Sequence, residues 1–107
     1  MIVNVLGVDY TVRGSDSKSD PYLTQMDGYT DTSTKECVVD IMESDELGSK
    51  RNLPEYRKQV TRHELIHAFL HESGLAENSW ATNEEMVDWF AIQAPKLLRA
   101  FEQADCL

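Results

Sequence analysis

The sequence has few cysteines, few basic residues and no long apolar run. Its two cysteines, Cys37 and Cys106, form neither a CxxC pair nor a disulfide framework. Lys and Arg total 10 against 19 Asp and Glu, so the formal net charge is −9 at pH 7. This shortage of positive charge argues against direct binding to nucleic acid, which needs basic side chains at the phosphates. It also argues against docking on anionic membranes.

Membrane insertion and secretion are not expected either. No apolar stretch approaches the roughly 18 residues of a membrane-spanning helix. Residues 1–5 lack the basic start and long apolar stretch of a signal peptide. Two free thiols in an acidic chain are typical of a reducing compartment, so we expect a cytoplasmic protein. The length of 107 residues, 41% of them hydrophobic, predicts one domain over residues 1–107 with a modest core.

The first part of the chain, residues 1–43, is expected to be rich in β-structure. Residues 2–12 are rich in β-branched side chains and are interrupted by Gly7, which predicts a hairpin of two short strands. Residues 14–28 are crowded with Ser, Asp and Gly and predict a loop with one helical turn. A second hairpin is expected over residues 29–42, with its turn at residues 32–35 and its best strand at 36–42.

The second part, residues 54–104, is expected to be helical, after an acidic stretch and a loop at residues 43–51. A first helix is predicted from Pro54 to Ser73, with Gly74 as its C-terminal cap. A second is predicted to start near Thr82 and to run to Gln93, with Pro95 kinking it or starting a third helix through Gln103. The fold class is therefore α+β: a small antiparallel sheet of two hairpins, followed by two to three helices on one face.

All three histidines fall within the first predicted helix, in the segment HELIHAFLH at residues 63–71. His63 and His67 lie one helical turn apart on the same face, so both imidazoles can reach one Zn²⁺ ion. Glu64 lies about 100° further round the helix, where it can reach water on that ion without binding the metal. The HExxH motif therefore predicts a zinc site with Glu64 as general base.

A catalytic zinc has three protein ligands, so a third is expected outside this helix. Glu84 and Asp88 line one edge of the apolar arc of the second predicted helix, whereas Glu85 turns outward. We therefore expect Glu84 as the third ligand and Asp88 as the acceptor of a hydrogen bond from a ligating imidazole. Glu85 and His71 remain alternatives for the third ligand. His71 lies one turn beyond His67, which favours a role in packing, beside a ligand or on the substrate side.

Two motifs of the chain resemble those of a known family. Residues 63–71 are similar to the HExxHxxxH helix of ImmA/IrrE-type metallopeptidases, which are small, gluzincin-like zinc proteins. Residues 84–91 are similar to the family's second motif, ExEANxFA, and residues 83–88 match the NExxxD pattern of thermolysin-like gluzincins. Met86 and Val87 depart from the second motif. The resemblance covers residues 60–95, about a third of the chain.

The resemblance implies a minimal zincin domain that binds Zn²⁺ and cleaves a protein or peptide substrate. Many short relatives are carried by bacteriophages and prophages, so the host cytoplasm is the expected location if a phage encodes the chain. The expected substrate is a cytoplasmic protein, such as a helix-turn-helix repressor of phage or host. The zincin scheme also implies an edge strand that holds an extended peptide above the zinc, and residues 36–42 are the candidate for it.

Three hypotheses follow for the function. The first is a zinc-dependent endopeptidase with His63, His67 and Glu84 as ligands, for which His71 and Tyr56 are candidates to stabilise the oxyanion. The second is a non-catalytic, zincin-shaped binding or regulatory protein whose acidic surface engages a basic partner. The third is a structural protein with a fortuitous histidine stripe. Glu64 favours the enzyme, because a binding protein needs no general base between two ligands.

Overall fold

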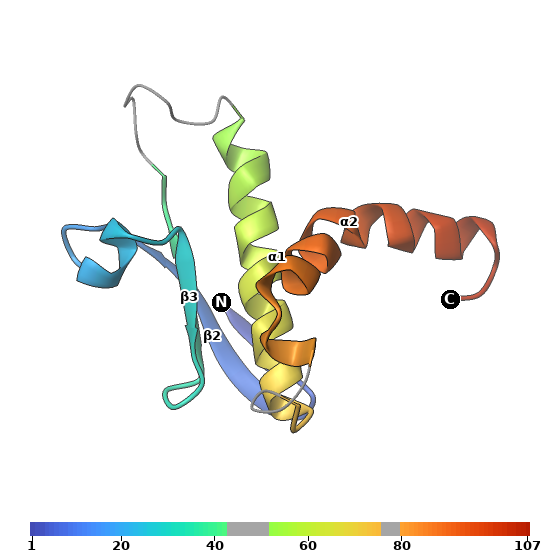
Figure 1. Cartoon of the computed structure of the whole chain (residues 1–107), viewed down its shortest axis with the longest axis horizontal. Coiled ribbons are helices and arrows are strands. Elements are labelled where there is room, and N and C mark those ends of the chain that lie inside the picture. The colour runs from blue at the N-terminus through green and yellow to red at the C-terminus, as the bar shows by residue number, and fades with distance from the viewer. Residues whose placement is uncertain (43–51, 76–79) are drawn as a thin grey trace.

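The computed structural model describes residues 1–42, 52–75 and 80–107, so the loop predicted at residues 43–51 lies outside the described residues. A four-stranded sheet lies against one helix, and a second helix packs on the first (Figure 1). The elements in chain order are β1 (Ile2–Val5), β2 (Val8–Ser15), the 3-10 turn η1 (Pro21–Thr24), β3 (Gly28–Asp31), β4 (Glu36–Asp40), α1 (Leu53–Glu72), the 3-10 turn η2 (Trp80–Thr82) and α2 (Glu84–Gln103). The predicted α+β class is confirmed.

The sheet contains both predicted hairpins but is mixed rather than antiparallel. Strands β1 and β2 pair antiparallel, as do β3 and β4, whereas β2 and β4 run parallel in the order β1-β2-β4-β3. Strand β4 takes an inner position because Cys37, Val38 and Val39 are all buried, as expected for a strand covered on both faces. The more polar β3 is left at the edge, so residues 36–42 were the wrong candidate for the edge strand.

The core joins the sheet to the inner face of α1. Val5, Tyr10, Cys37 and Ala68 are fully buried and form one cluster. The Tyr10 hydroxyl donates to Glu72 Oε2 at 2.6 Å, and Lys35 Nζ donates to the same oxygen at 2.9 Å. These bonds fix the C-terminal end of α1 against the sheet. Both cysteines are free thiols, Cys37 buried and Cys106 exposed.

Helix α1 begins and ends close to the predicted residues. Asn52 caps its N-terminus, and Pro54 lies in the first turn, where its missing N–H leaves no hydrogen bond unmade. At the other end Gly74 has a φ of +78°, a left-handed conformation that glycine adopts without steric strain. The amides of Gly74 and Leu75 donate to the carbonyls of His71 and Leu70, which closes the last turn.

Helix α2 starts near the predicted residue and continues through Pro95, which is one of the two predicted alternatives. Its N-cap is Asn83, whose side chain accepts from the Met86 amide, rather than Thr82, which lies in η2. Asn is as good an N-cap as Ser and better than Thr, so the cap one residue later prevails. The helix continues through Pro95 to Gln103, and no third α-helix occurs in the described residues. None of the described helices is both long enough and apolar enough to cross a membrane.

Candidate metal centre

The two histidines of the HExxH motif face the same point beside α1. His63 Nε2 and His67 Nε2 are 3.1 Å apart, because residues four apart lie one turn above each other. The ring centroids are 4.8 Å apart, with the planes inclined at 68°. Both side chains are mostly buried, with exposed fractions of 17% and 24%. The helix therefore presents two imidazole nitrogens to one point.

Glu84 brings a carboxylate to the same point from the first residue of α2. Its Oε2 is 3.0 Å from His63 Nε2, and its Oε1 is 3.0 Å from His67 Nε2. The packing of α2 on α1 sets this position, since Val87 and Ala91 are buried one and two turns further along. Arg62 Nε also donates to the Ala91 carbonyl at 2.6 Å and ties the two helices together.

These three groups fit a divalent metal ion such as zinc. Zn²⁺ binds imidazole nitrogen and carboxylate oxygen at about 2.0–2.1 Å, so neighbouring ligand atoms of a tetrahedral site lie about 3.3 Å apart. The contacts of 3.0–3.3 Å between His63, His67 and Glu84 agree with that spacing. Among the described residues, these three form the one group of His, Cys, Asp or Glu placed to hold a metal ion.

Asp88 lies on the far side of the His63 ring from Glu84 and bears on what the three groups can hold between them. Its Oδ1 lies 2.6 Å from His63 Nδ1, the ring nitrogen that faces away from Glu84. When Nδ1–H donates to Asp88, the neutral ring leaves a lone pair on Nε2, which faces a carboxylate and a second imidazole. Lone pairs and negative charge at 3 Å repel one another unless a proton or a metal ion lies between them. The Asp88–His63 pair is the arrangement that orients metal-binding histidines.

Glu64 is not one of the three candidate ligands and contacts the edge strand β3. Its side chain is buried, and the Thr30 hydroxyl of β3 lies 2.9 Å from Oε1 and 2.8 Å from the Glu64 carbonyl oxygen. Burial raises the pKa of the Glu64 carboxyl, and the hydrogen bond with Thr30 and the neighbouring histidines oppose this shift. The carboxyl is thus held beside the metal-ligand group with a raised affinity for protons.

Strand β3 can approach Glu64 because residue 28 has no side chain. A Cβ on Gly28 would lie 2.9 Å from the Val38 carbonyl oxygen, 3.0 Å from Val60 Cγ1 and 3.3 Å from Glu64 Cγ. Neither Gly28 nor Thr30 was predicted from the sequence. The sequence showed only a glycine just before the predicted hairpin and a threonine within it, and nothing local indicated that α1 packs there.

The candidate centre lies in a cleft with a volume of about 900 Å³. Its walls come from the segment around β3, from α1 and from the start of α2. The lining residues are Met26, Asp27, Gly28, Tyr29, Thr30, Thr32, Tyr56, Gln59, Val60, His63, Glu64, His67, His71, Glu84 and Asp88. The cleft is therefore large enough for several residues of a peptide beside the three candidate ligands.

The other residues singled out from the sequence, His71, Tyr56 and Glu85, do not belong to the ligand group. His71 lines the cleft but is not part of the group, and its Nε2 lies 3.9 Å from Glu72 Oε2. Tyr56 also lines the cleft, and its hydroxyl donates to Asp27 Oδ2. Burial, followed by this hydrogen bond, raises the pKa of Tyr56 to about 12, so the hydroxyl keeps its proton at neutral pH. Glu85 is exposed on α2 and does not line the cleft.

The chain matches no family model, no curated protein and no solved structure. The resemblance to ImmA/IrrE-type metallopeptidases therefore stays a prediction from two short motifs. What supports a function is the geometry of His63, His67, Glu84 and the residues around them.

Proposed function

We propose that this chain is a zinc-dependent metallopeptidase of the ImmA/IrrE type. His63, His67 and Glu84 would hold the ion, and Glu64 would act as general base. The observation that carries the proposal is the convergence of two imidazole nitrogens and one carboxylate within 3.0–3.3 Å, beside a buried glutamate. Metal-binding groups that serve structure alone do not require such a glutamate between the two histidines.

Zinc, when bound, supplies a Lewis acid that acidifies water and polarises a carbonyl. Glu64 contributes the acceptor for the proton that leaves the attacking water, and it returns that proton to the departing amine. A carboxyl whose pKa is raised by burial suits both steps, because it accepts and releases a proton closer to neutral pH. Thr30 steadies the carboxyl, and Asp88 fixes the tautomer of His63.

The edge strand gives the proposed substrate a place to bind. Among the described residues, β3 pairs with β4 on one side only, and Gly28, Tyr29 and Thr30 line the cleft. An extended peptide could add to β3 by main-chain hydrogen bonds and pass in front of the metal site. We propose a peptide segment of a cytoplasmic protein as the substrate, such as the phage or host repressor that the family resemblance implies, and, from the two free thiols, a cytoplasmic location for the chain itself.

The test compares cleavage by the zinc-loaded chain and its Glu64→Gln variant in a cytoplasmic extract. New protein N-termini are identified by mass spectrometry after each incubation. Glu64→Gln keeps the size of the side chain but removes the base, so new termini should appear with the wild type alone. Glu85→Gln, on the exposed side of α2, is the matched control and should cleave like the wild type. Equal sets of termini with wild type and Glu64→Gln would refute the peptidase.

A non-catalytic binding protein is the alternative that the same experiment detects. If zinc binds with the expected residues but no new termini arise, the domain recognises a partner without cutting it. The acidic charge of −9 would then favour a basic partner.

A further inference from the structure

The described residues leave the C-terminal half of α2 largely uncovered. No residue from Pro95 to Leu107 is buried, and Figure 1 shows this half projecting away from α1 and the sheet. The radius of gyration is 14.8 Å, compared with about 13 Å for a compact domain of this length. The projecting half, residues 95–103, is therefore a helical segment without a buried residue.

This projecting half nevertheless has an apolar face. Leu98 lies four residues after Ala94, which borders this half, and Phe101 lies three residues after Leu98, so the three share one side of the helix. Leu98 is 50% exposed and Phe101 is 44% exposed. In proteins most of the stability of a helix comes from packing of such an apolar face. The face is therefore expected to be covered by another surface.

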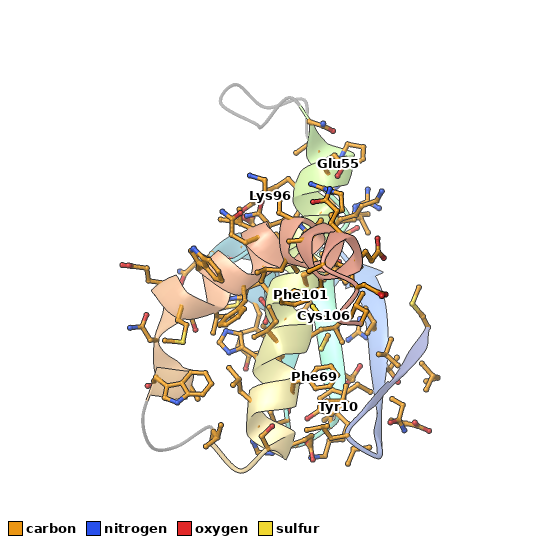
Figure 2. The ribbon with its side chains drawn as sticks, turned by 90° about the vertical axis from the view of Figure 1, so that its right-hand side faces the viewer. Tyr10, Glu55, Phe69, Lys96, Phe101 and Cys106 are labelled. Carbon is orange, nitrogen blue, oxygen red and sulfur yellow. The ribbon has the colours of Figure 1, made fainter. Side chains whose placement is uncertain are left out.

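A matching surface lies on the same side of the molecule, between α1 and the first half of α2. It is an apolar groove of about 340 Å³, shaped by side chains of both helices. Its lining residues are Ile66, Phe69, Leu70, Ser73, Trp80, Met86, Val87, Phe90 and Ala94. Three of its aromatic rings stay 39–46% exposed, namely Phe69, Trp80 and Phe90. Figure 2 shows Phe69 and Phe101 on the face toward the viewer.

We propose that two copies of this chain form a symmetric dimer in which the projecting half of α2 from each copy lies in the α1–α2 groove of the other. The chain carries both a groove and an amphipathic helix of the kind that such grooves bind. Its own projecting half cannot enter its own groove, because α2 forms one wall of that groove and continues away from it. A two-fold axis lets both contacts form at once.

The exposed apolar area is of the size that such a dimer needs. Four aromatic side chains and Leu98, each about half exposed, present on the order of 400 Å² of apolar surface per copy. That value equals the largest apolar patch on ordinary monomers, and such patches often serve in binding. A stable interface buries about 800 Å² per partner, roughly half of it apolar, so the patch would supply its apolar centre.

The charges also favour a second copy as the occupant. The projecting half carries Lys96 and Arg99 against the single acid Glu102, whereas the whole chain has a net charge of −9. Contact between this locally basic half and the acidic remainder of a second copy offsets part of the repulsion between two chains of net charge −9. The groove shares no lining residue with the metal cleft, so dimer formation does not depend on the proposed peptidase activity.

The first test is the mass of the zinc-free chain in solution by sedimentation equilibrium from 1 to 200 µM. Twice the chain mass of 12.2 kDa is expected at the upper end. The double variant Leu98→Gln, Phe101→Gln should weaken the dimer at least about 100-fold, because it removes two apolar anchors. Gln is a good helix former and both positions are exposed, so the single chain should fold normally. Ile2→Gln, at a 62% exposed position on β1, is the matched control and should dimerise.

Mixing two variants tests whether the projecting half of one copy binds the groove of the other. Phe69→Glu alters the groove and keeps the projecting helix, whereas the double variant keeps the groove. Each should be monomeric alone, and the mixture should form heterodimers through the one remaining helix–groove contact. A monomeric wild type at 200 µM, a dimer that survives the double variant, or variants that fail to pair when mixed would each overturn the proposal. Should circular dichroism show Phe69→Glu to be unfolded, the milder Phe69→Ser takes its place.

Discussion

The hydroxyl of Thr30 is expected to stabilise the folded protein and to hold the Glu64 carboxyl in position. The Thr30 hydroxyl oxygen lies 2.9 Å from Glu64 Oε1 and 2.8 Å from the Glu64 carbonyl oxygen, so it can donate to either of them. Thr30→Val keeps the β-branched shape that suits a strand and removes the hydroxyl. The substitution leaves a buried carboxyl without that partner, which costs about 1–3 kcal/mol. We therefore expect the free energy of unfolding to fall by this amount.

The measurement is urea unfolding of the metal-free protein in EDTA at several pH values, followed by circular dichroism. The hydrogen bond with Thr30 lowers the pKa of Glu64 against the raising effect of burial, so its loss moves that pKa further up. A raised pKa in the folded protein means that stability is lost as pH rises through it. The destabilisation by Thr30→Val should therefore be larger at neutral pH than at pH values where Glu64 is protonated.

Thr30→Ser is the control, because it keeps the hydroxyl and loses one methyl group. It should cost less than about 1 kcal/mol and show little dependence on pH, since removing one methyl group typically costs of this order. The reasoning is wrong if Val and Ser at position 30 destabilise the protein equally, or if the effect of Val is the same at every pH. Either result would show that the hydroxyl does not bind the Glu64 carboxyl in solution.

Three further predictions concern Asp88, Gly28 and Glu72. Asp88→Asn should weaken zinc binding about 10–100-fold in a competition titration with a chelating dye, because the amide no longer holds the imidazole of His63 as firmly; unchanged affinity would contradict that role. Gly28→Ala should destabilise the fold by about 1–3 kcal/mol in urea, since its Cβ would lie 2.9 Å from the Val38 carbonyl oxygen and 3.0 Å from Val60 Cγ1, and a neutral effect would show that residue 28 has more room between β4 and α1. The pKa of Glu72 is lowered by its hydrogen bonds with Tyr10 and Lys35, so its stabilisation is present above the unfolded value of about 4.3 and is lost as pH falls. Glu72→Gln should flatten the acid side of a plot of melting temperature against pH, and an unchanged slope would contradict this.

The helices of this fold were predictable from the sequence, because residue spacing and capping residues within each segment indicate a helix. The four-residue spacing of His63 and His67 puts them on one face in any α-helix, and the apolar arc of α2 indicated that Glu84 would face α1. The structure brings these three side chains together. The position of Asp88, one turn beyond Glu84, follows from the same periodicity.

The arrangement of the sheet was not predictable in the same way, because it depends on competition between strands. Both hairpins were foreseen, but local patterns do not say which strands pair between the hairpins, and in the structure β4 lies inside the sheet with Cys37, Val38 and Val39 buried. That placement leaves β3 at the edge and brings Thr30 beside Glu64. A threonine that binds a side chain 34 positions away leaves no periodic signal in the sequence.

Zinc binding by purified variants tests the central claim most directly. Isothermal titration should show one Zn²⁺ per wild-type chain, and His63→Ala and Glu84→Ala should abolish or greatly weaken that binding. Glu64→Gln and Glu85→Gln should keep it, since neither residue belongs to the proposed ligand set. A wild-type chain that binds no zinc, or a Glu84→Ala variant that binds it as tightly as the wild type, would contradict the account.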